Sequence, residues 1–441
     1  LAASMMTSAA SPRSTGTRLA KRATSPSAVR PTNIVLIVLD DVGFSDLGAF
    51  GSEIQTPTID ALAATGLRYT RFDSRAVCSA TRAALLTGRN NQTVGMADLP
   101  APRRDFGGIG KDKGELPQNI ELLPQVLGKA GYRTYALGKW HLAPDWEDGS
   151  QGNNASWPLQ RGFDRYYGFI SGWTNQFHPD LVEDNHALSK PDRTGYHLSE
   201  DLVDHAIANL DASAGKPSFL YLAFGAGHAP HQVPKAFVDR YKTRYAEGWD
   251  KVRMARIARL KRMGMIPGDT ALPPINPGDR PWNTLTKTER TVYARFMAVY
   301  AGFIEHTDTQ IGRLVTHLKK TGQYDNTMFV LISDNGAAGE GGQKGAFLSP
   351  YKEGDLTPDQ MLERLDDLGT ERSGPEYQRP WAMAGVTPLR RYKVWPYAGG
   401  VRTPLIISWP RGIAARGAIR TQLIDTIDLA PTIADVPSVA A

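Results

Sequence analysis

Short apolar runs alternate with amphipathic stretches along most of this chain. Four runs rich in β-branched or aromatic residues predict buried strands, and they span residues 33–39, 219–224, 328–333 and 404–408. Apolar positions at helical spacing predict helices over residues 58–65, 120–129, 202–210 and about 289–320, the last closed by Gly322. This alternation is typical of an α/β fold, so we predict a large mixed, mostly parallel sheet sandwiched by helices.

The pattern divides the chain into a tail and one large domain. Residues 1–32 are rich in Ser, Ala, Thr and Arg without a continuous apolar segment, so we predict a disordered tail rather than an intact secretory signal. We place the domain at residues 33–437. Within it, residues 337–396 run through Gly, Pro and charged positions, which predicts a long insertion over the functional site. Its residues Tyr377 and Trp381 fit an aryl pocket and surface packing equally well.

Composition is that of a globular protein, with 41% hydrophobic and 22% charged residues among 441. The single cysteine excludes an intramolecular disulfide framework, and no apolar run approaches the roughly 18 residues needed to cross a bilayer. We therefore predict no membrane partner and a cytoplasmic location. Because the chain begins at Leu1 rather than Met, we expect a processed or fragmentary N-terminus, which keeps a periplasmic or secreted location open.

Positive charge is in slight excess, with a net charge of +6. Such an excess would suit an anionic substrate, but it is more often a solvated surface. The densest basic stretch, residues 251–262, lacks the interleaved aromatic residues of a base-stacking surface. We therefore predict an exposed helix face there and no nucleic-acid partner.

Acidic residues directly follow two of the predicted strands. Asp40 and Asp41 come after the first strand, and Asp334 and Asn335 come after the third. Open α/β sheets bind ligands at the carboxyl ends of their strands, and an all-oxygen set suits Ca²⁺ or Mg²⁺ better than zinc. Separately, the acid pair also fits a helix cap, and Asn335-Gly336 fits a hairpin turn. The repetition of a strand followed by acids favours one shared metal site.

Cys78 opens a predicted helical run, and Arg82 lies one turn further on the same face. Free N–H groups at a helix start attract an anion, so this position favours a thiolate with a lowered pKa. Taken alone, a lone cysteine is nevertheless more often an inert buried residue. A phosphotyrosine-phosphatase loop is disfavoured, because its cysteine and arginine are more widely spaced, with glycines between them.

Lys139 and His141 stand two residues apart at the end of a predicted short strand. On an extended chain this spacing points both side chains to one side and Trp140 to the other. A surface lysine and a structural histidine are the ordinary alternative.

Two further candidates lie near other strand ends. His228 follows the strand over residues 219–224, whereas its neighbour His231 has no such placement. Lys393 precedes the strand over residues 404–408 by a Gly399-Gly400 turn and is, by itself, one of many lysines.

Together these residues resemble the sulfatase family, specifically the bacterial arylsulfatase branch of the alkaline phosphatase superfamily. Cys78-Ser-Ala-Thr-Arg82, followed by Ala-Ala-Leu-Leu-Thr-Gly88, matches the family's modification motif, Cys-x-Pro/Ala-x-Arg with its trailing helix. Residues 131–142 match the second family signature, and the segments 39–46, 333–336 and 392–404 occur in the family order. The resemblance spans nearly everything from Asn33 onwards and implies an alkaline-phosphatase-like fold, with residues 33–437 as the catalytic domain.

The resemblance implies that Cys78 is oxidised to formylglycine by a formylglycine-generating enzyme and that the aldehyde is then hydrated. One oxygen of the hydrate would attack sulfur and expel an alcohol or phenol; the other would lose its proton so that sulfate is ejected. Sulfate monoesters are attacked poorly, so the developing charge needs preorganised cations. The implied activity is hydrolysis of a small-molecule sulfate monoester, with aryl sulfates as the expected class.

Each role in this chemistry falls on a matching residue. The implied metal ligands, for Ca²⁺ or alternatively Mg²⁺, are Asp40, Asp41, Asp334, Asn335 and modified Cys78. The implied catalytic and substrate-binding residues are Arg82 for holding the hydrate, Lys139 and Lys393 for the sulfate oxygens, His228 for protonating the leaving group, and His141 as base or orienting partner.

Two features depart from the family pattern. Ala80 stands where proline is commoner, which would lower the efficiency of conversion. The sequence stops soon after Pro431, where relatives continue into a small C-terminal subdomain, so we expect that subdomain to be missing. Two alternatives stay open: a phosphate or phosphonate ester hydrolase of the same superfamily, and a non-catalytic anion- or metal-binding protein in which Cys78 stays a thiol.

Overall fold

The computed structural model describes residues 33–100, 114–147, 149, 152–213 and 215–438, so the tail predicted for residues 1–32 lies outside the described residues. The strands are β1 (Asn33–Leu39), β2 (Leu67–Tyr69), β3 (Phe72–Asp73), β4 (Arg133–Lys139), β5 (Arg165–Phe169), β6 (Val182–Glu183), β7 (His186–Ala187), β8 (Ser218–Ala223), β9 (Thr327–Ser333), β10 (Leu405–Ser408), β11 (Ala418–Arg420) and β12 (Ile424–Asp425). The helices are α1 (Pro57–Thr65), α2 (Cys78–Thr87), α3 (Leu123–Lys129), α4 (Leu198–Ala212), α5 (Lys235–Asp239), α6 (Gly248–Arg262), α7 (Lys287–Lys320), α8 (Pro358–Glu363), α9 (Arg379–Gly385), α10 (Ala398–Val401) and α11 (Leu429–Ser438).

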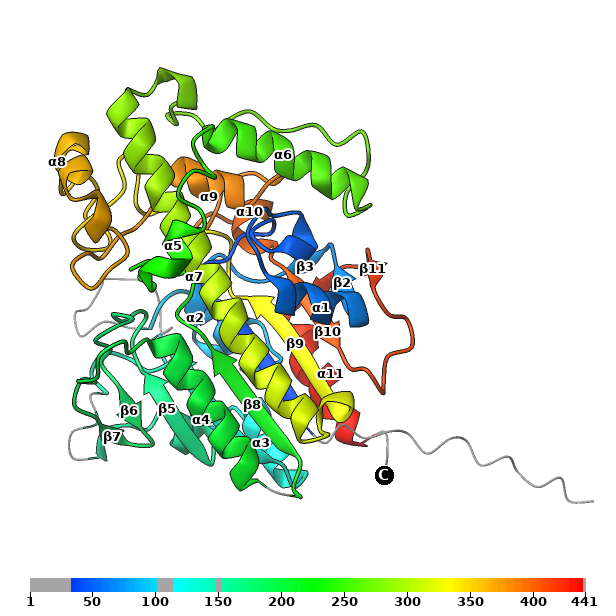
Figure 1. Ribbon diagram of the computed structural model, residues 1–441. Coiled ribbons are helices and arrows are strands. Elements are labelled where there is room, and N and C mark those ends of the chain that lie inside the picture. The colour runs from blue at the N-terminus through cyan, green and yellow to red at the C-terminus, as the bar shows by residue number, and fades with distance from the viewer. Residues whose placement is uncertain (1–32, 101–113, 148, 150–151, 214, 439–441) are drawn as a thin grey trace, which may run out of the picture.

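One large sheet organises the described part of the chain (Figure 1). Its 10 strands follow the order β11-β2-β10-β9-β1-β8-β4-β5-β6-β7. The five central strands β9, β1, β8, β4 and β5 are parallel to one another. On one side β10 joins β9 antiparallel, β2 joins β10 antiparallel and β11 joins β2 parallel; on the other side β6 and β7 join antiparallel. The predicted mixed, mostly parallel sheet is confirmed, and each of the four predicted strands begins and ends within one residue of its predicted position.

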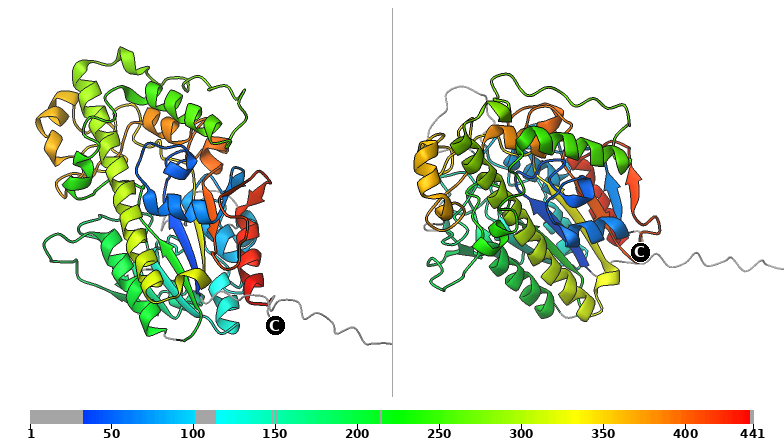
Figure 2. Two further views of the ribbon diagram at one scale, coloured as in Figure 1. Left: turned by 45° about the vertical axis from the view of Figure 1, so that its right-hand side comes forward. Right: turned by 45° about the horizontal axis from the view of Figure 1, so that its top comes forward.

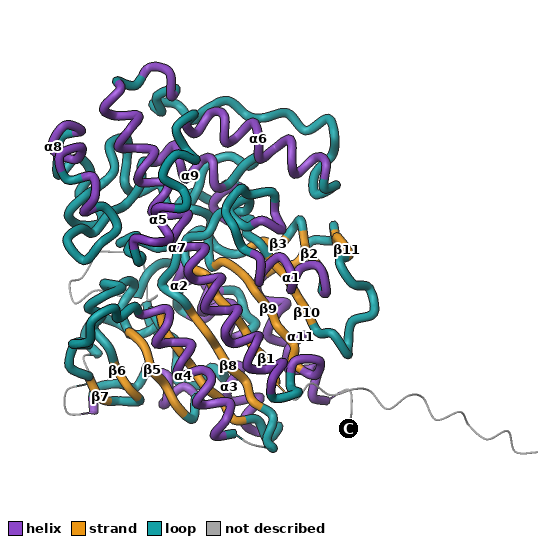
Figure 3. Tube along the Cα trace, in the orientation of Figure 1, coloured by secondary structure: helices purple, strands orange, loops and turns teal. Residues whose placement is uncertain are grey.

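Helices cover both faces of this sheet (Figures 2 and 3). Alternate residues of β1 point to opposite sides: Val35, Ile37 and Leu39 belong to the core beneath α1, α4 and α7, and Ile34, Leu36 and Val38 to the core beneath α2, α3 and α11. Burial on both faces explains why β1 is a continuous apolar run rather than an alternating one.

The long helix α7 starts two residues before its predicted position. Thr286 Oγ1 accepts a hydrogen bond from the Glu289 amide, while Glu289 Oε2 accepts one from the Thr286 amide. This capping box satisfies two amides at the helix start and sets where α7 begins. Among the described helices, none has the length and apolar character needed to cross a membrane.

The basic stretch at residues 251–262 forms most of α6, but the prediction of an exposed helix face is wrong for its central arginines. Arg256 is fully buried, with Nη1 2.5 Å from Asp46 Oδ1 and Nη2 2.8 Å from Glu53 Oε1. Arg253 is buried as well. Counting basic residues could not reveal these partners, because Asp46 and Glu53 lie some 200 residues earlier in the sequence.

Residues 337–396 contain α8 and α9 and are packed into the domain. Tyr377 and Trp381 line neither an aryl pocket nor the surface: both are buried in the core, where Trp381 Nε1 donates to the Tyr293 carbonyl oxygen at 2.9 Å. Both readings given to these two rings from the sequence are therefore wrong.

Replacing Arg256 tests its structural role. Arg256→Ala would leave the Asp46 carboxylate buried with no cation beside it, so we expect the free energy of unfolding to fall by about 3–5 kcal/mol. Arg262→Ala, at the exposed end of the same helix, is the control and should change it by less than about 0.5 kcal/mol. Denaturant titration of both variants measures the difference; equal losses would contradict the assignment.

Candidate active site

The acidic residues predicted from the sequence meet at one edge of the sheet. Because β1 and β9 are parallel neighbours in register, with Leu39 beside Ser333, the residues that follow them lie side by side. The Asp41 amide donates to Asp334 Oδ1 at 3.3 Å, and Asn335 Nδ2 donates to Asp41 Oδ1 at 2.6 Å. Asp40, Asp41, Asp334 and Asn335 are all buried.

Two lysines neutralise the first two carboxylates. Lys139, the last residue of β4, places Nζ 2.7 Å from Asp40 Oδ2, and Lys393 places Nζ 3.0 Å from Asp41 Oδ2. Burial alone would lower the pKa of each lysine, but the facing carboxylates outweigh it and raise the pKa of both. Burial would likewise raise the pKa of Asp41, yet Lys393, His228 and Lys139 together hold that pKa well below its usual range. Both lysines and Asp41 are therefore charged.

The start of α2 brings Arg82 and Cys78 to the same edge. Arg82 is fully buried; its Nε and Nη2 donate to Asp334 Oδ2 at 3.0 and 2.7 Å, and its Nη1 donates to the Lys139 carbonyl oxygen at 3.0 Å and to Tyr221 Oη at 3.2 Å. These bonds fix the first turn of α2 against β4, β8 and β9. Cys78, at the first position of that turn, is buried as well.

His141 contacts the thiol directly, with Nδ1 3.1 Å from Cys78 Sγ. Burial and the neighbouring cations Lys139 and Arg82 hold the pKa of His141 well below its ordinary value, so its imidazole is neutral. The pKa of Cys78 is raised, mainly by burial. The predicted thiolate with a lowered pKa is therefore wrong, because loss of solvation outweighs the helix start and the nearby lysines.

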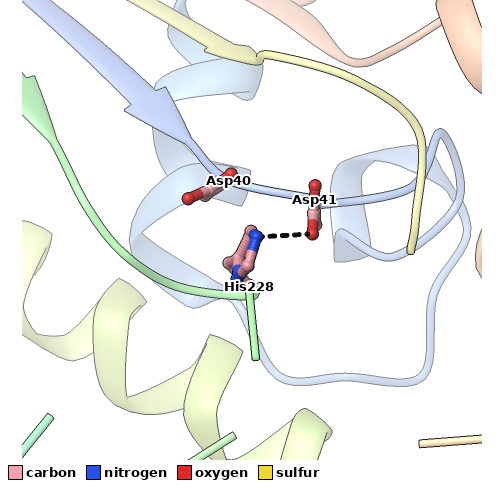
Figure 4. A group of neighbouring side chains, drawn as sticks. All are labelled: Asp40, Asp41 and His228. Atoms are coloured by element: carbon pink, nitrogen blue, oxygen red, sulfur yellow. Dashed lines mark ion pairs between the residues drawn. The ribbon is translucent and has the colours of Figure 1, made fainter. Parts of the chain in front are cut away.

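His228 completes the group from the loop after β8 (Figure 4). Its Nδ1 lies 2.6 Å from the Ala229 carbonyl oxygen, and its Nε2 lies 3.7 Å from Asp41 Oδ2. Asp40, Asp41 and His228 each offer a ligand atom within 4.8 Å of the others, a spacing that could hold a metal ion.

The donor set fits a hard divalent cation. Asp40 Oδ1 and Asn335 Oδ1 are buried oxygens without a hydrogen-bond partner among the described residues. Buried polar atoms are nearly always satisfied, and two unsatisfied acceptors beside Asp41 and Asp334 are what an oxygen-binding cation would use.

A comparison with protein-family models matches residues 32–438 to the family described as Sulfatase. The chain belongs to the sulfatase family. It is 35% identical over 426 residues to an uncharacterized sulfatase of Schizosaccharomyces pombe, across 92% of this chain and 75% of that relative. It is 33% identical over 418 residues to an arylsulfatase of Klebsiella aerogenes, across 91% of this chain and 85% of that one. This sulfatase is thus a sulfuric ester hydrolase.

Solved structures agree with the fold. The structure of Ps i-CgsB in complex with k-i-k-neocarrahexaose superposes with a TM-score of 0.60 at 26% identity, covering 93% of this sulfatase and 72% of that chain. The phosphonate monoester hydrolase of Agrobacterium radiobacter superposes with a TM-score of 0.56 at 18% identity, which shows a shared fold alone. The predicted fold and family are confirmed.

Every site residue predicted for this sulfatase reaches the same sheet edge, while the roles assigned to them stay predictions. Lys139 and His141 both face the site and Trp140 points away, donating through Nε1 to the Ser156 carbonyl oxygen. His231, which was left aside, is buried between the rings of Tyr300 and Tyr377.

Sequence reasoning missed three residues that touch the site. Tyr351 Oη lies 3.0 Å from His228 Nε2, Glu340 Oε2 lies 2.9 Å from Lys393 Nζ, and Tyr221 accepts from Arg82. Glu340 and Tyr351 belong to the segment 337–396, whose weak pattern gives no signal for single positions. Tyr221 lies within the apolar run of β8, so the sequence pattern identifies it only as a buried strand residue.

Adding and removing metal tests the cation site without measuring turnover. We expect Ca²⁺ to raise the melting temperature, because a ligand bound only by the folded state at about 100 times its Kd stabilises it by about 2.7 kcal/mol. Asp40→Asn should lose most of this shift, and Asp192→Asn, at an exposed loop position, should keep it. A shift of equal size in both variants would argue against this site.

Proposed function

We propose that this sulfatase hydrolyses aryl sulfates and that Cys78 is the precursor of its nucleophile. The supporting observation is a single buried site in which Cys78 and His141 lie beside four acidic or amide ligands and three cations. The aryl class rests on the 33% identity to an arylsulfatase over most of both chains.

In this proposal Asp40, Asp41, Asp334 and Asn335 hold one divalent metal together with the modified residue 78. We favour Ca²⁺ because its flexible coordination suits a mixed carboxylate and amide set, with Mg²⁺ as the alternative. When bound, the metal and the hydrated formylglycine supply a nucleophilic oxygen and a strong positive field.

The chain's own residues then divide the remaining work. Lys139 and Lys393, already charged in the free site, hold two sulfate oxygens and stabilise the charge that develops on them. His141, whose neutral Nδ1 faces residue 78, accepts a proton there. His228 turns Nε2 to the site, because its Nδ1–H donates to the Ala229 carbonyl oxygen. Burial and Lys393 hold the pKa of His228 well below its ordinary value, so the neutral ring accepts at Nε2 and takes up a proton there before it can protonate the leaving oxygen.

Burial also constrains maturation. Cys78 is 1% exposed, so a formylglycine-generating enzyme could not reach it in the folded domain. We infer that conversion precedes folding of α2 onto the sheet. The cytoplasmic location stays a prediction.

Removing the precursor should abolish turnover. We expect Cys78→Ala to lower kcat/KM for an aryl sulfate by about a thousandfold or more, since no other described residue offers a nucleophile beside His141. Ser79→Ala is the matched neighbour and should retain most activity, because the Ser79 hydroxyl has no hydrogen-bond partner among the residues that the structure describes. Intact mass of the peptide carrying residue 78, from the native host, accompanies the assay; an active protein whose mass is wholly that of a thiol would contradict the mechanism.

Matched esters separate this function from its closest alternative. The converted enzyme should show a higher kcat/KM for an aryl sulfate than for the corresponding aryl phosphate, because the family model that matches the chain and its arylsulfatase relative both point to sulfate esters. A preference for the phosphate would favour a phosphate or phosphonate ester hydrolase instead.

A further inference from the structure

Exposed aromatic side chains gather beside the catalytic residues. Among the described residues, four side chains of tryptophan, tyrosine or phenylalanine are exposed: Trp173, Tyr351, Trp395 and Tyr397. Each belongs to a segment that also contacts the site. Large exposed rings cost solvation free energy, and here they occur as two pairs, Trp173 with Tyr351 and Trp395 with Tyr397. A pair of exposed rings beside a catalytic residue indicates a binding surface.

Trp173 is held next to His141 by its own loop. A Cβ atom built on Gly172 would lie 2.7 Å from His141 Cε1, so the backbone before Trp173 packs directly on that imidazole. The loop is anchored on its other side as well: the Gln176 amide donates to Gln232 Oε1 at 2.9 Å, in the segment that follows His228. Trp173 therefore has a fixed place at the rim, with 43% of its surface exposed.

Tyr351 brings a second ring to the same side. Its hydroxyl lies 3.0 Å from His228 Nε2, its ring centroid lies 6.5 Å from that of Trp173 at an interplanar angle of 66°, and the residue is 45% exposed. The two rings thus form a continuous apolar surface that ends at the nitrogen which we assign to the leaving oxygen.

We propose that Trp173 and Tyr351 form a platform that binds the planar aromatic ring of the leaving group. The proposal rests on the proposed function, because His228 must face the leaving oxygen for the attached ring to reach these side chains. With that oxygen near Nε2, Tyr351 lies within reach of the attached carbon skeleton, since its hydroxyl is 3.0 Å from the same nitrogen, and the Trp173 ring lies beside Tyr351. An aryl ring can stack on one of these rings and meet the edge of the other.

The polar neighbours of the platform favour an aromatic ring over a sugar. Ser171 Oγ donates to the Trp173 carbonyl oxygen, and Asn175 Oδ1 accepts from the Phe177 and His178 amides. The Ser171 hydroxyl proton and the Asn175 side-chain oxygen are thus engaged with their own backbone and are less available to sugar hydroxyl groups.

The other two exposed rings differ from this platform. The Arg391 guanidinium lies 4.4 Å from the ring centroid of Trp395 and 6.0 Å from that of Tyr397. A cation thus already covers a face of Trp395. Trp395 is therefore a matched control: an exposed tryptophan close to Lys393 but outside the proposed platform.

The test compares kcat/KM for an aryl sulfate and for an alkyl sulfate on converted protein. We expect Trp173→Ala to lower the aryl-to-alkyl ratio about five- to tenfold, the size of a lost ring-stacking contact, and Trp395→Ala to leave the ratio within about twofold of the parent. Tyr351→Ala should lower the ratio as well. Tyr351→Phe should keep it, because the ring remains and both substrates use the same His228.

The outcomes separate this inference from the proposed function. An unchanged ratio in Trp173→Ala, or an equal fall in Trp395→Ala, would overturn the platform while leaving the sulfatase intact. A larger loss on a carbohydrate sulfate than on the aryl sulfate would show that the platform binds a sugar and would overturn the aryl assignment. A parent enzyme that cleaves aryl phosphate in preference to every sulfate ester would instead refute the proposed function itself.

Discussion

Three carboxylates buried at the ends of two neighbouring strands form the centre on which this structure depends. Asp40, Asp41 and Asp334 are balanced by three buried cations, Lys139, Lys393 and Arg82. Uncompensated buried charges cost several kcal/mol each, so each carboxylate depends on its cation. Even with Lys139 beside it, burial raises the pKa of Asp40 well above its usual range. The cations come from β4, from the segment ahead of α10 and from α2, and this charge balance therefore couples distant parts of the chain to one site.

The same constraint positions the group that we propose as nucleophile precursor. Arg82 ties the first turn of α2 to Asp334 and to the end of β4, and Cys78 begins that turn. Burial then raises the pKa of the thiol, which makes the encoded side chain a poor nucleophile. A chemically converted residue 78 would avoid this difficulty, because its reactivity would no longer depend on forming a buried thiolate.

The residues proposed to bind the sulfate group and those that would select the rest of the substrate lie in different parts of the molecule. The sheet edge with its acids and cations suits a tetrahedral anion beside a metal, and a phosphonate monoester hydrolase shares its fold. The organic part of the ester has to lie outside that centre. There the loop carrying Trp173 and the segment carrying Tyr351 offer rings whose spacing and exposure would select among leaving groups.

From the sequence alone, the strands, the strand-end acids and the motif from Cys78 to Arg82 could be predicted, because apolar runs and short spacings report local structure. The pairing of Lys393 with Asp41 could not, since 352 residues separate them. Nor could the burial of Arg256, the raised pKa of Cys78, or the contact between Tyr351 and His228. These features depend on which side chains the fold brings together and on how much water it removes from them, and a local sequence pattern reports neither.

The sequence by itself determined the residue types and the family. Only the tertiary structure decided the partners of these residues, their charge states and the aromatic rim, because electrostatics and solvation act through space.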